Sequence, residues 1–163
     1  MIDSPATATP KVSWTILIPP PVLAAALSFV FWAIFAVLGM PPVAWLMALW
    51  PLGLPLVVAG VALAVWGVST FRRAGTQLMP HAESHRQFVV AGPFRFTRNP
   101  MYLGLLTTIL GVPLTSGNPL QFLAPIIFFA WINGRYIPFE EATLVRQFGD
   151  AYLAYRKRVR RWL

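Results

Sequence analysis

The run PVLAAALSFVFWAIFAVL, residues 21–38, decides the fold class. It lies within a stretch from Val12 to Phe71 that contains no Lys, Arg, Asp or Glu, and a second such stretch runs from Asn99 to Gly134. A helix of about 20 apolar residues spans the ~30 Å hydrocarbon core of a bilayer, and loops in water are not this apolar. The sequence therefore predicts an integral membrane protein.

The overall composition agrees with this prediction and excludes other classes. Hydrophobic residues make up 57% of the chain and charged residues only 11%, and the mean hydropathy is +0.63. A net charge of +8 would suggest nucleic-acid binding in a soluble protein, but here the basic residues cluster between and after apolar runs. We expect no nucleic-acid partner. The absence of cysteine excludes disulfides, thiolate nucleophiles and Cys-ligated metals.

Four membrane helices are predicted, at 21–38, 44–71, 101–114 and 120–136. Pro51 and Pro55 predict a kink early in the second, and Gly60 and Gly67 favour the close approach of a neighbouring helix. The turn TSGNP, residues 115–119, makes the last two helices a hairpin. The third run is only about 21 Å long at 1.5 Å per residue, so we expect it to tilt or to extend beyond these limits.

The segment from Pro138 to Leu163 is predicted to be one or two amphipathic helices on the cytosolic side of the membrane. Residues at helical spacing form an apolar stripe that includes one acid: Glu141, Leu144, Val145, Phe148, Tyr152, Tyr155 and Val159. Gly149 and Asp150 predict a break within the segment. The expected fold class is an all-α polytopic membrane protein of about four transmembrane helices, with a C-terminal hairpin followed by this amphipathic part.

The basic residues predict the orientation in the membrane. Five of the thirteen lie in residues 72–100 and seven in residues 135–163, and positively charged loops remain on the cytoplasmic side. Both segments and the N-terminus are therefore expected in the cytoplasm, in a membrane of the inner or endomembrane type. The tail RKRVRR, residues 156–161, is expected to contact anionic lipid head groups of the bilayer.

Polar groups gather where residues 72–100 meet the hairpin. They come from the run GPFRFTRNPMY (residues 92–102), from Arg135 and Tyr136, and from the adjacent acids Glu140 and Glu141. Because Glu141 shares the apolar stripe, its carboxylate should be paired, with Arg98 or Arg135 as the partner. Two interpretations stay open: a ligand site, or an ion pair that only fastens the hairpin to the last helix.

His81 and His85 have the i, i+4 spacing of two ligands on one helix. A catalytic zinc site needs three protein ligands, and no third one is evident. We therefore expect no metal.

The ordered motifs resemble the isoprenylcysteine carboxyl methyltransferase and phospholipid methyltransferase superfamily. They are GPF (92–94), RNPMY (98–102), EEATL (140–144) and FGDAYLAY (148–155), at the spacing of that family and around a helical hairpin. The resemblance covers roughly residues 75–160. It implies an S-adenosylmethionine-dependent transferase that methylates a lipophilic small-molecule or lipidated substrate. It also implies a single domain, with two N-terminal helices (1–71) before a cofactor-binding core (72–163).

The resemblance also implies the site residues. The expected catalytic residues are Arg98 and Glu141, and those expected to hold the cofactor are His81, Gly92, Pro93, Phe94, Asn99, Tyr102, Arg135, Glu140 and Glu141. Their chemistry suits the ligand, because a guanidinium can hold its carboxylate, a carboxylate can accept bonds from its ribose or amino group, and an aromatic ring can cover its adenine.

Two features depart from the larger eukaryotic relatives. Asn99 stands where many of them carry His, and the N-terminal part is shorter, as in small bacterial members. The resemblance therefore implies a bacterial inner-membrane protein whose active site faces the cytoplasm. The methyl acceptor, a carboxylate or an amine, stays open. So do two other functions: an NADPH-dependent membrane reductase of related architecture, and a membrane lipid-binding protein without catalysis.

Overall fold

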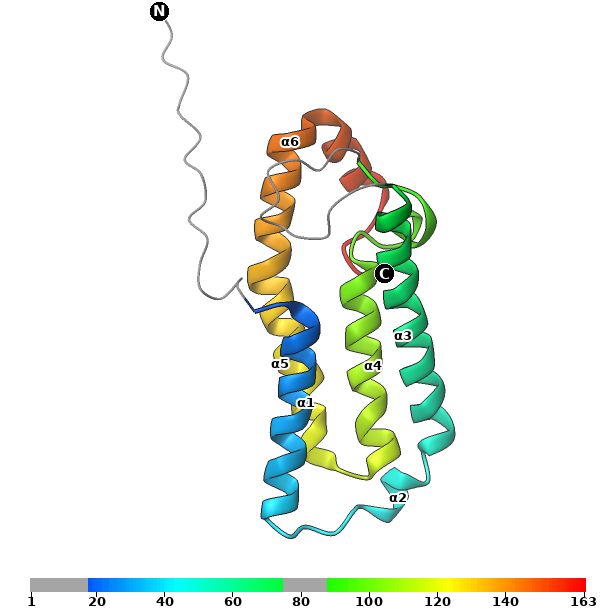
Figure 1. Cartoon of the computed structure of the whole chain (residues 1–163), viewed down its shortest axis with the longest axis vertical. Helices are drawn as coiled ribbons and strands as arrows, with labels where there is room; N and C mark the ends of the chain where they lie inside the picture. The colour runs from blue at the N-terminus through cyan, green and yellow to red at the C-terminus, as the bar shows by residue number, and fades with distance from the viewer. Residues whose placement is uncertain (1–17, 75–87) are drawn as a thin grey trace, which may run out of the picture.

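The computed structural model describes residues 18–74 and 88–163, and helices dominate it (Figure 1). Long helices run side by side along the vertical axis of Figure 1, and short turns join them at the lower end. In chain order the elements are α1 (Pro20–Val37), α2 (Ala44–Met47), α3 (Trp50–Arg73), the 3-10 helix η2 (Gly92–Arg95), α4 (Pro100–Ser116), the 3-10 helix η3 (Pro119–Phe122), α5 (Leu123–Trp131), the π-helix η4 (Ile132–Tyr136) and α6 (Ile137–Arg158).

The predicted fold class is confirmed. Within the described residues, three helical segments are long and apolar enough to cross a membrane: Pro20–Val37, Trp50–Arg73 and Pro119–Arg158. The fourth, α4, has 17 residues and is therefore about 26 Å long. It extends beyond the predicted limits of 101–114 at both ends, as expected, but stays shorter than the ~30 Å hydrocarbon core. Many large apolar side chains of α1 and α3 point outward, such as Phe29 and Trp66, as lipid-facing residues do.

Glycines hold α3 and α4 together. Gly53, Gly60 and Gly67 are buried along one side of α3 at seven-residue spacing, a repeat that keeps one face of a helix against its neighbour. A Cβ placed on Gly104 of α4 would lie 2.6 Å from both the carbonyl oxygen of Gly60 and the backbone nitrogen of Ala64. No side chain fits at that distance, so the two backbones touch. The close approach predicted at Gly60 and Gly67 is confirmed.

The second predicted span is divided. The short helix α2 ends at Met47, and α3 begins at Trp50 with Pro51 in its first turn and Pro55 inside it. Proline is tolerated in a first helical turn because its missing N–H would have no intrahelical partner there. The interruption therefore precedes Pro51, and α2 caps the end of the bundle, where the Val43 N–H donates to the Gly117 carbonyl at 2.9 Å.

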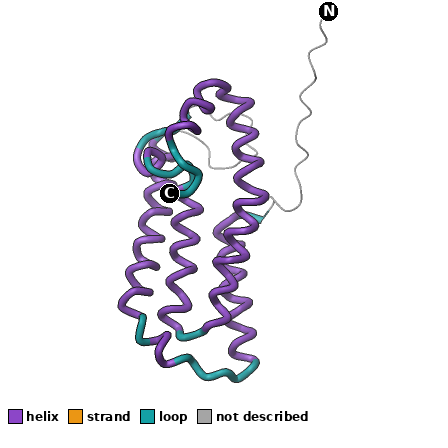
Figure 2. Tube along the Cα trace, turned by 180° about the vertical axis from the view of Figure 1, so that it is seen from behind, coloured by secondary structure: helices purple, strands orange, loops and turns teal. Residues whose placement is uncertain are grey.

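The hairpin arm and the last helix form one continuous helical segment, which differs from the predicted separation at Pro138. Helix α5 leads through η4 directly into α6 (Figure 2). A π-turn inserts one extra residue into the helical ladder, and Pro138 lies in the first turn that follows it. The predicted break at Gly149 is present as a kink, with φ 50° and ψ −126°. The helix ends at Arg158, and the chain beyond it is extended. The predicted helix as far as Leu163 is therefore too long.

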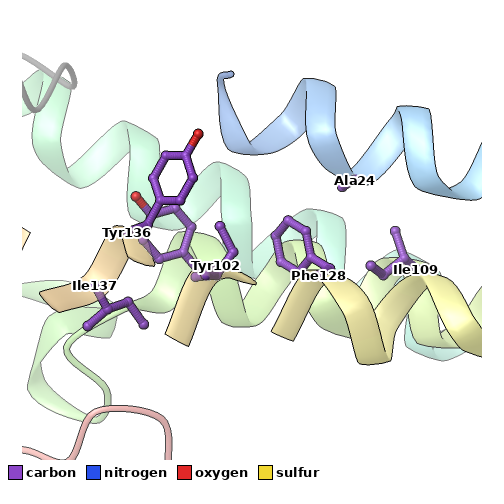
Figure 3. Close-up of a cluster of buried hydrophobic side chains, with 7 residues drawn as sticks. Ala24, Tyr102, Ile109, Phe128, Tyr136 and Ile137 are labelled. Carbon is purple, nitrogen blue, oxygen red and sulfur yellow. The ribbon is translucent and has the colours of Figure 1, made fainter. Parts of the chain in front are cut away.

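A buried cluster joins α1, α4 and the α5–α6 segment (Figure 3). Ala24 of α1 and Phe128 of α5 are almost fully buried in it. Tyr102 of α4 and Tyr136 of η4 lie beside each other, with their ring centroids 6.5 Å apart. The Tyr136 hydroxyl donates to the carbonyl of Ile18. The cluster therefore links the beginning of α1 to the end of the bundle that carries the polar residues.

Candidate functional site

Glu141 of α6 is the centre of a polar cluster that also includes the loop before α4 and the C-terminal residues. Its side chain, 10% exposed, forms ion pairs with two arginines. Arg98 Nη2 lies 3.0 Å from Oε1, and Arg161 Nη2 lies 2.8 Å from Oε2. The expected pairing of Glu141 with Arg98 is therefore present, and both carboxylate oxygens are engaged by protein.

Arg98 lies in the loop between η2 and α4, and its side chain is only 9% exposed. Besides Glu141 it contacts the carbonyl oxygen of Arg156, through Nη1 at 3.4 Å. Its Nε is buried and has no hydrogen-bond partner among the described residues. A buried donor without an acceptor is costly, so this guanidinium keeps unused capacity for an acceptor from a ligand.

Arg161 belongs to the C-terminal strap, which we define as residues Val159–Leu163. The strap lies parallel to the loop before α4 at a bridge between Thr97 and Arg160. The Arg98 N–H donates to the Arg160 carbonyl at 3.0 Å, and Asn99 Nδ2 donates to the Arg161 carbonyl at 2.9 Å. The strap is thus bonded to the same loop that carries Arg98.

Asn133 ties the strap to the π-helix. Its Oδ1 accepts hydrogen bonds from Arg161 Nη1 at 3.2 Å and from Trp162 Nε1 at 3.1 Å. The Trp162 ring also packs on Phe129 of α5, with centroids 5.1 Å apart. Side chains from η4 and α5 therefore fix the direction from which Arg161 approaches Glu141.

The carboxylate of Glu140 lies in a different environment from that of Glu141. Its Oε1 accepts a hydrogen bond from the hydroxyl of Tyr102 on α4. The Tyr102 ring belongs to the buried cluster and packs beside Tyr136. Two adjacent carboxylates are thus divided between an arginine pair and a tyrosine, and Glu140 has no ion pair within the described residues.

The other residues expected to hold a cofactor form the frame of the site. Gly92 has φ +58°, and a Cβ there would lie 2.9 Å from Thr70 Oγ1, so glycine is needed for packing on α3. Pro93 and Phe94 are buried, and the Phe94 carbonyl accepts a hydrogen bond from Tyr155 of α6 at 2.7 Å. Asn99 is bonded to the strap, as described above.

One predicted residue, Arg135, is not brought into the cluster. Arg135 is exposed on η4 and forms no ion pair with a described residue. It was one of the two predicted partners of Glu141, and Arg161 pairs with Glu141 instead. His81 and His85 lie outside the described residues. Among the described residues, no group of three potential ligands is placed to hold a metal ion.

Three contributors were missed by sequence reasoning. Arg161 was one of five basic residues in a tail assigned to lipid head groups, and the extended strap has no periodicity that would single it out. Trp162 follows it without a motif. Asn133 did carry a signal, because it is a polar side chain inside an otherwise apolar span, and such residues face protein rather than lipid.

Comparison with known proteins identifies the class. The family described as phospholipid methyltransferase matches residues 48–151, more than half of the chain. This range contains Arg98, Tyr102, Glu140 and Glu141 and ends before Arg161. The chain belongs to the phospholipid methyltransferase family and is an integral membrane protein.

Individual relatives agree with this membership. The chain is 30% identical to protein-S-isoprenylcysteine O-methyltransferase B of Arabidopsis thaliana over 108 residues, 66% of this chain and 55% of that protein. It is 32% identical to methanethiol S-methyltransferase 1 of Bradyrhizobium diazoefficiens over 40% of this chain and 22% of that protein. An uncharacterised protein of Haemophilus influenzae is 48% identical over its whole length, 39% of this chain. The chain thus spans about half of the plant enzyme, and the relatives with a named activity are methyltransferases.

Proposed function

We propose that this protein transfers a methyl group from S-adenosylmethionine to a lipophilic acceptor at the membrane surface. The observation that carries the proposal is the overlap of the family match with the polar cluster: the matched residues 48–151 include both carboxylates, Tyr102 and Arg98. Neither the NADPH-dependent reductase nor the non-catalytic lipid-binding protein has comparable support, because the relatives named for an activity are methyltransferases.

The donor set suits the amino-acid end of the cofactor. Arg98 is buried beside Glu141, and its Nε has no acceptor among the described residues. A guanidinium with free N–H groups binds a carboxylate through charge-assisted hydrogen bonds. We assign Arg98 to the carboxylate of S-adenosylmethionine.

The Glu140 carboxylate is suited to accept a hydrogen bond from the cofactor. Its Oε1 accepts from Tyr102, and a carboxylate has further lone pairs for a ribose hydroxyl or an amino group. Glu141 is less suited to this role, because Arg98 and Arg161 already occupy both of its oxygens. We therefore propose that Glu141 orients the two arginines and does not contact the ligand.

Aromatic rings near the cluster suit an adenine ring. Phe88 packs on Phe148 with a centroid distance of 5.2 Å, and on Tyr155 at the same distance. Tyr152 lies within this group. Aromatic faces stack on planar heterocycles, so this group is the candidate adenine contact.

When bound, S-adenosylmethionine would supply an activated methyl group on a positively charged sulfur for transfer to an acceptor nucleophile. The contribution of the protein is to align the reactants and exclude water. A carboxylate acceptor is ionised at neutral pH, whereas an amine must lose a proton, and Glu140 is then the base that the site offers. The apolar outer surfaces of α1 and α3 hold the site at a membrane, where a lipophilic acceptor is concentrated.

Methyl transfer can be measured directly. Purified protein in detergent, supplied with radiolabelled S-adenosylmethionine and a bacterial lipid extract, is expected to move label into the organic phase. Chelator should not reduce the transfer, because the proposal assigns no metal to the site.

We also propose that the end of the helix bundle that carries Glu141, Arg98 and Arg161 faces the cytoplasm. We further propose that residues 1–163 act as one domain. Because the chain has no cysteine, single cysteines report topology without background. In intact cells an impermeant maleimide should label Met40→Cys, in the loop after α1, and should label Leu163→Cys only after permeabilisation. Labelling of Leu163→Cys in intact cells would contradict this orientation.

A further inference from the structure

The two arginines that contact Glu141 do not share it equally. Arg161 approaches with two nitrogens, Nε at 3.3 Å from Oε1 and Nη2 at 2.8 Å from Oε2. Arg98 approaches with Nη2 alone, at 3.0 Å from Oε1. The two-point contact, which gives an arginine–carboxylate pair its geometric specificity, therefore belongs to Arg161.

This division leaves donors of Arg98 available. A guanidinium carries five N–H donors, and the described partners of Arg98 are one Glu141 oxygen and the Arg156 carbonyl. Its Nε is buried without a described partner. If Arg161 were absent, Glu141 Oε2 would lose its partner. Arg98 could then turn to bind both oxygens through Nε and Nη2, and its spare donor would be consumed.

The net charge of Arg98, Arg161 and Glu141 also favours an anionic ligand group beside Arg98. One carboxylate between two guanidiniums leaves an excess of one positive charge. The side chains of Arg98 and Glu141 are nine-tenths buried, whereas that of Arg161 is 31% exposed, so the charge of Arg98 is the less solvated of the two. Buried charges are stable when they are paired. An anionic group of a ligand beside Arg98 would balance this charge.

We infer that Arg161 is a positioning residue: it occupies Glu141 so that Arg98 keeps its free donors for the anionic group of the ligand. The inference rests on the proposed function, in which that group is the carboxylate of the cofactor. Arg161 lies beyond the residues that the family match covers, so the role is assigned from this chain's own contacts.

The strap holds Arg161 in register with Arg98. The Arg161 carbonyl accepts hydrogen bonds from Thr97 Oγ1 at 3.1 Å and from Asn99 Nδ2 at 2.9 Å, one residue on either side of Arg98. Asn133 holds the far side of the Arg161 guanidinium. Both arginines are therefore fixed relative to each other by a short network that runs through Arg161 and the backbone of the strap.

A pair of ligands separates this role from general stabilisation. S-adenosylhomocysteine carries the amino-acid carboxylate, and methylthioadenosine has the same adenosine and thioether without it. In Arg161→Gln, calorimetry in detergent should show affinity for S-adenosylhomocysteine falling about tenfold or more, the range of a charge-assisted hydrogen bond. Affinity for methylthioadenosine should stay within about twofold, the change expected where no such bond is lost. A variant that is merely less folded loses both ligands equally.

Arg160→Gln is the matched control. It removes the same charge one residue away, its side chain is exposed, and only its backbone contacts the Arg98 loop. Its ratio of the two affinities should equal that of the wild type. Equal ratios in Arg161→Gln and Arg160→Gln would overturn the positioning role, whereas failure of the wild type to bind either ligand would instead overturn the proposed function.

Coupling to Glu141 gives a second, independent measure. In a Glu141→Gln background no charged carboxylate remains to capture Arg98, so Arg161→Gln should change the affinity ratio by less than about twofold, well under the effect expected in the wild-type background. Additive effects of the two substitutions on the ratio would show that Arg161 does not act through Glu141, and would overturn the inference.

Discussion

Replacing Gly104 by alanine is expected to destabilise the protein by roughly 1–3 kcal/mol, the range of overpacked cores. The new methyl group would lie 2.6 Å from backbone atoms of Gly60 and Ala64, and backbone cannot move aside as a side-chain tip can. Helices α3 and α4 would have to separate along their length. The free energy of unfolding in a single detergent measures the effect.

Gly134→Ala is the matched control for this substitution. Gly134 is also helical, and a Cβ there would meet nothing within 4 Å. Alanine is the better helix former by about 1 kcal/mol, so this variant should be as stable as the wild type or slightly more stable. Equal losses in the two variants would show that α3 and α4 do not pack through their glycines.

Glu141→Gln is expected to lower stability by about 3 kcal/mol or more, the cost of removing one partner from a buried ion pair. Glutamine keeps the shape of the side chain, but Arg98 and Arg161 would then face each other without the carboxylate that both contact. The melting temperature without ligand should fall clearly.

Asp150→Asn provides the comparison for Glu141→Gln. Asp150 lies on the same helix, is exposed and has no described ion pair; such surface changes usually stay within about 0.5 kcal/mol. A Glu141→Gln protein with an unchanged melting temperature and weaker cofactor binding would instead place Glu141 in contact with the ligand.

The fold was largely predictable because lipid imposes strong rules on sequence. Charge-free runs located the membrane helices, glycines at 60 and 67 indicated the close helix pair, and Gly149 indicated the kink. The separation at Pro138 was wrong because the π-turn before it inserts a residue into the helical ladder. That insertion is invisible to a 3.6-residue period, which also cannot show that Arg135 is turned outward.

The candidate site was predictable only in part. The apolar stripe around Glu141 required a cationic partner, and Arg98 was one of the two residues named for it. Arg161 was hidden because the strap is extended and its role depends on hydrogen bonds to Thr97 and Asn99, which are more than 60 residues away in sequence. Tertiary contacts of this kind leave no local pattern.

The most direct test of the central claim is S-adenosylmethionine-dependent methylation of a lipophilic acceptor by the full chain. Labelled methyl groups should enter the organic phase with wild-type protein and with Arg160→Gln, and transfer should fall about tenfold or more with Arg98→Gln, which loses the charge-assisted contact to the cofactor. Transfer that persists unchanged in folded Arg98→Gln would contradict the assigned site. Folded wild-type protein that transfers no label to any lipid fraction would contradict the proposed function itself.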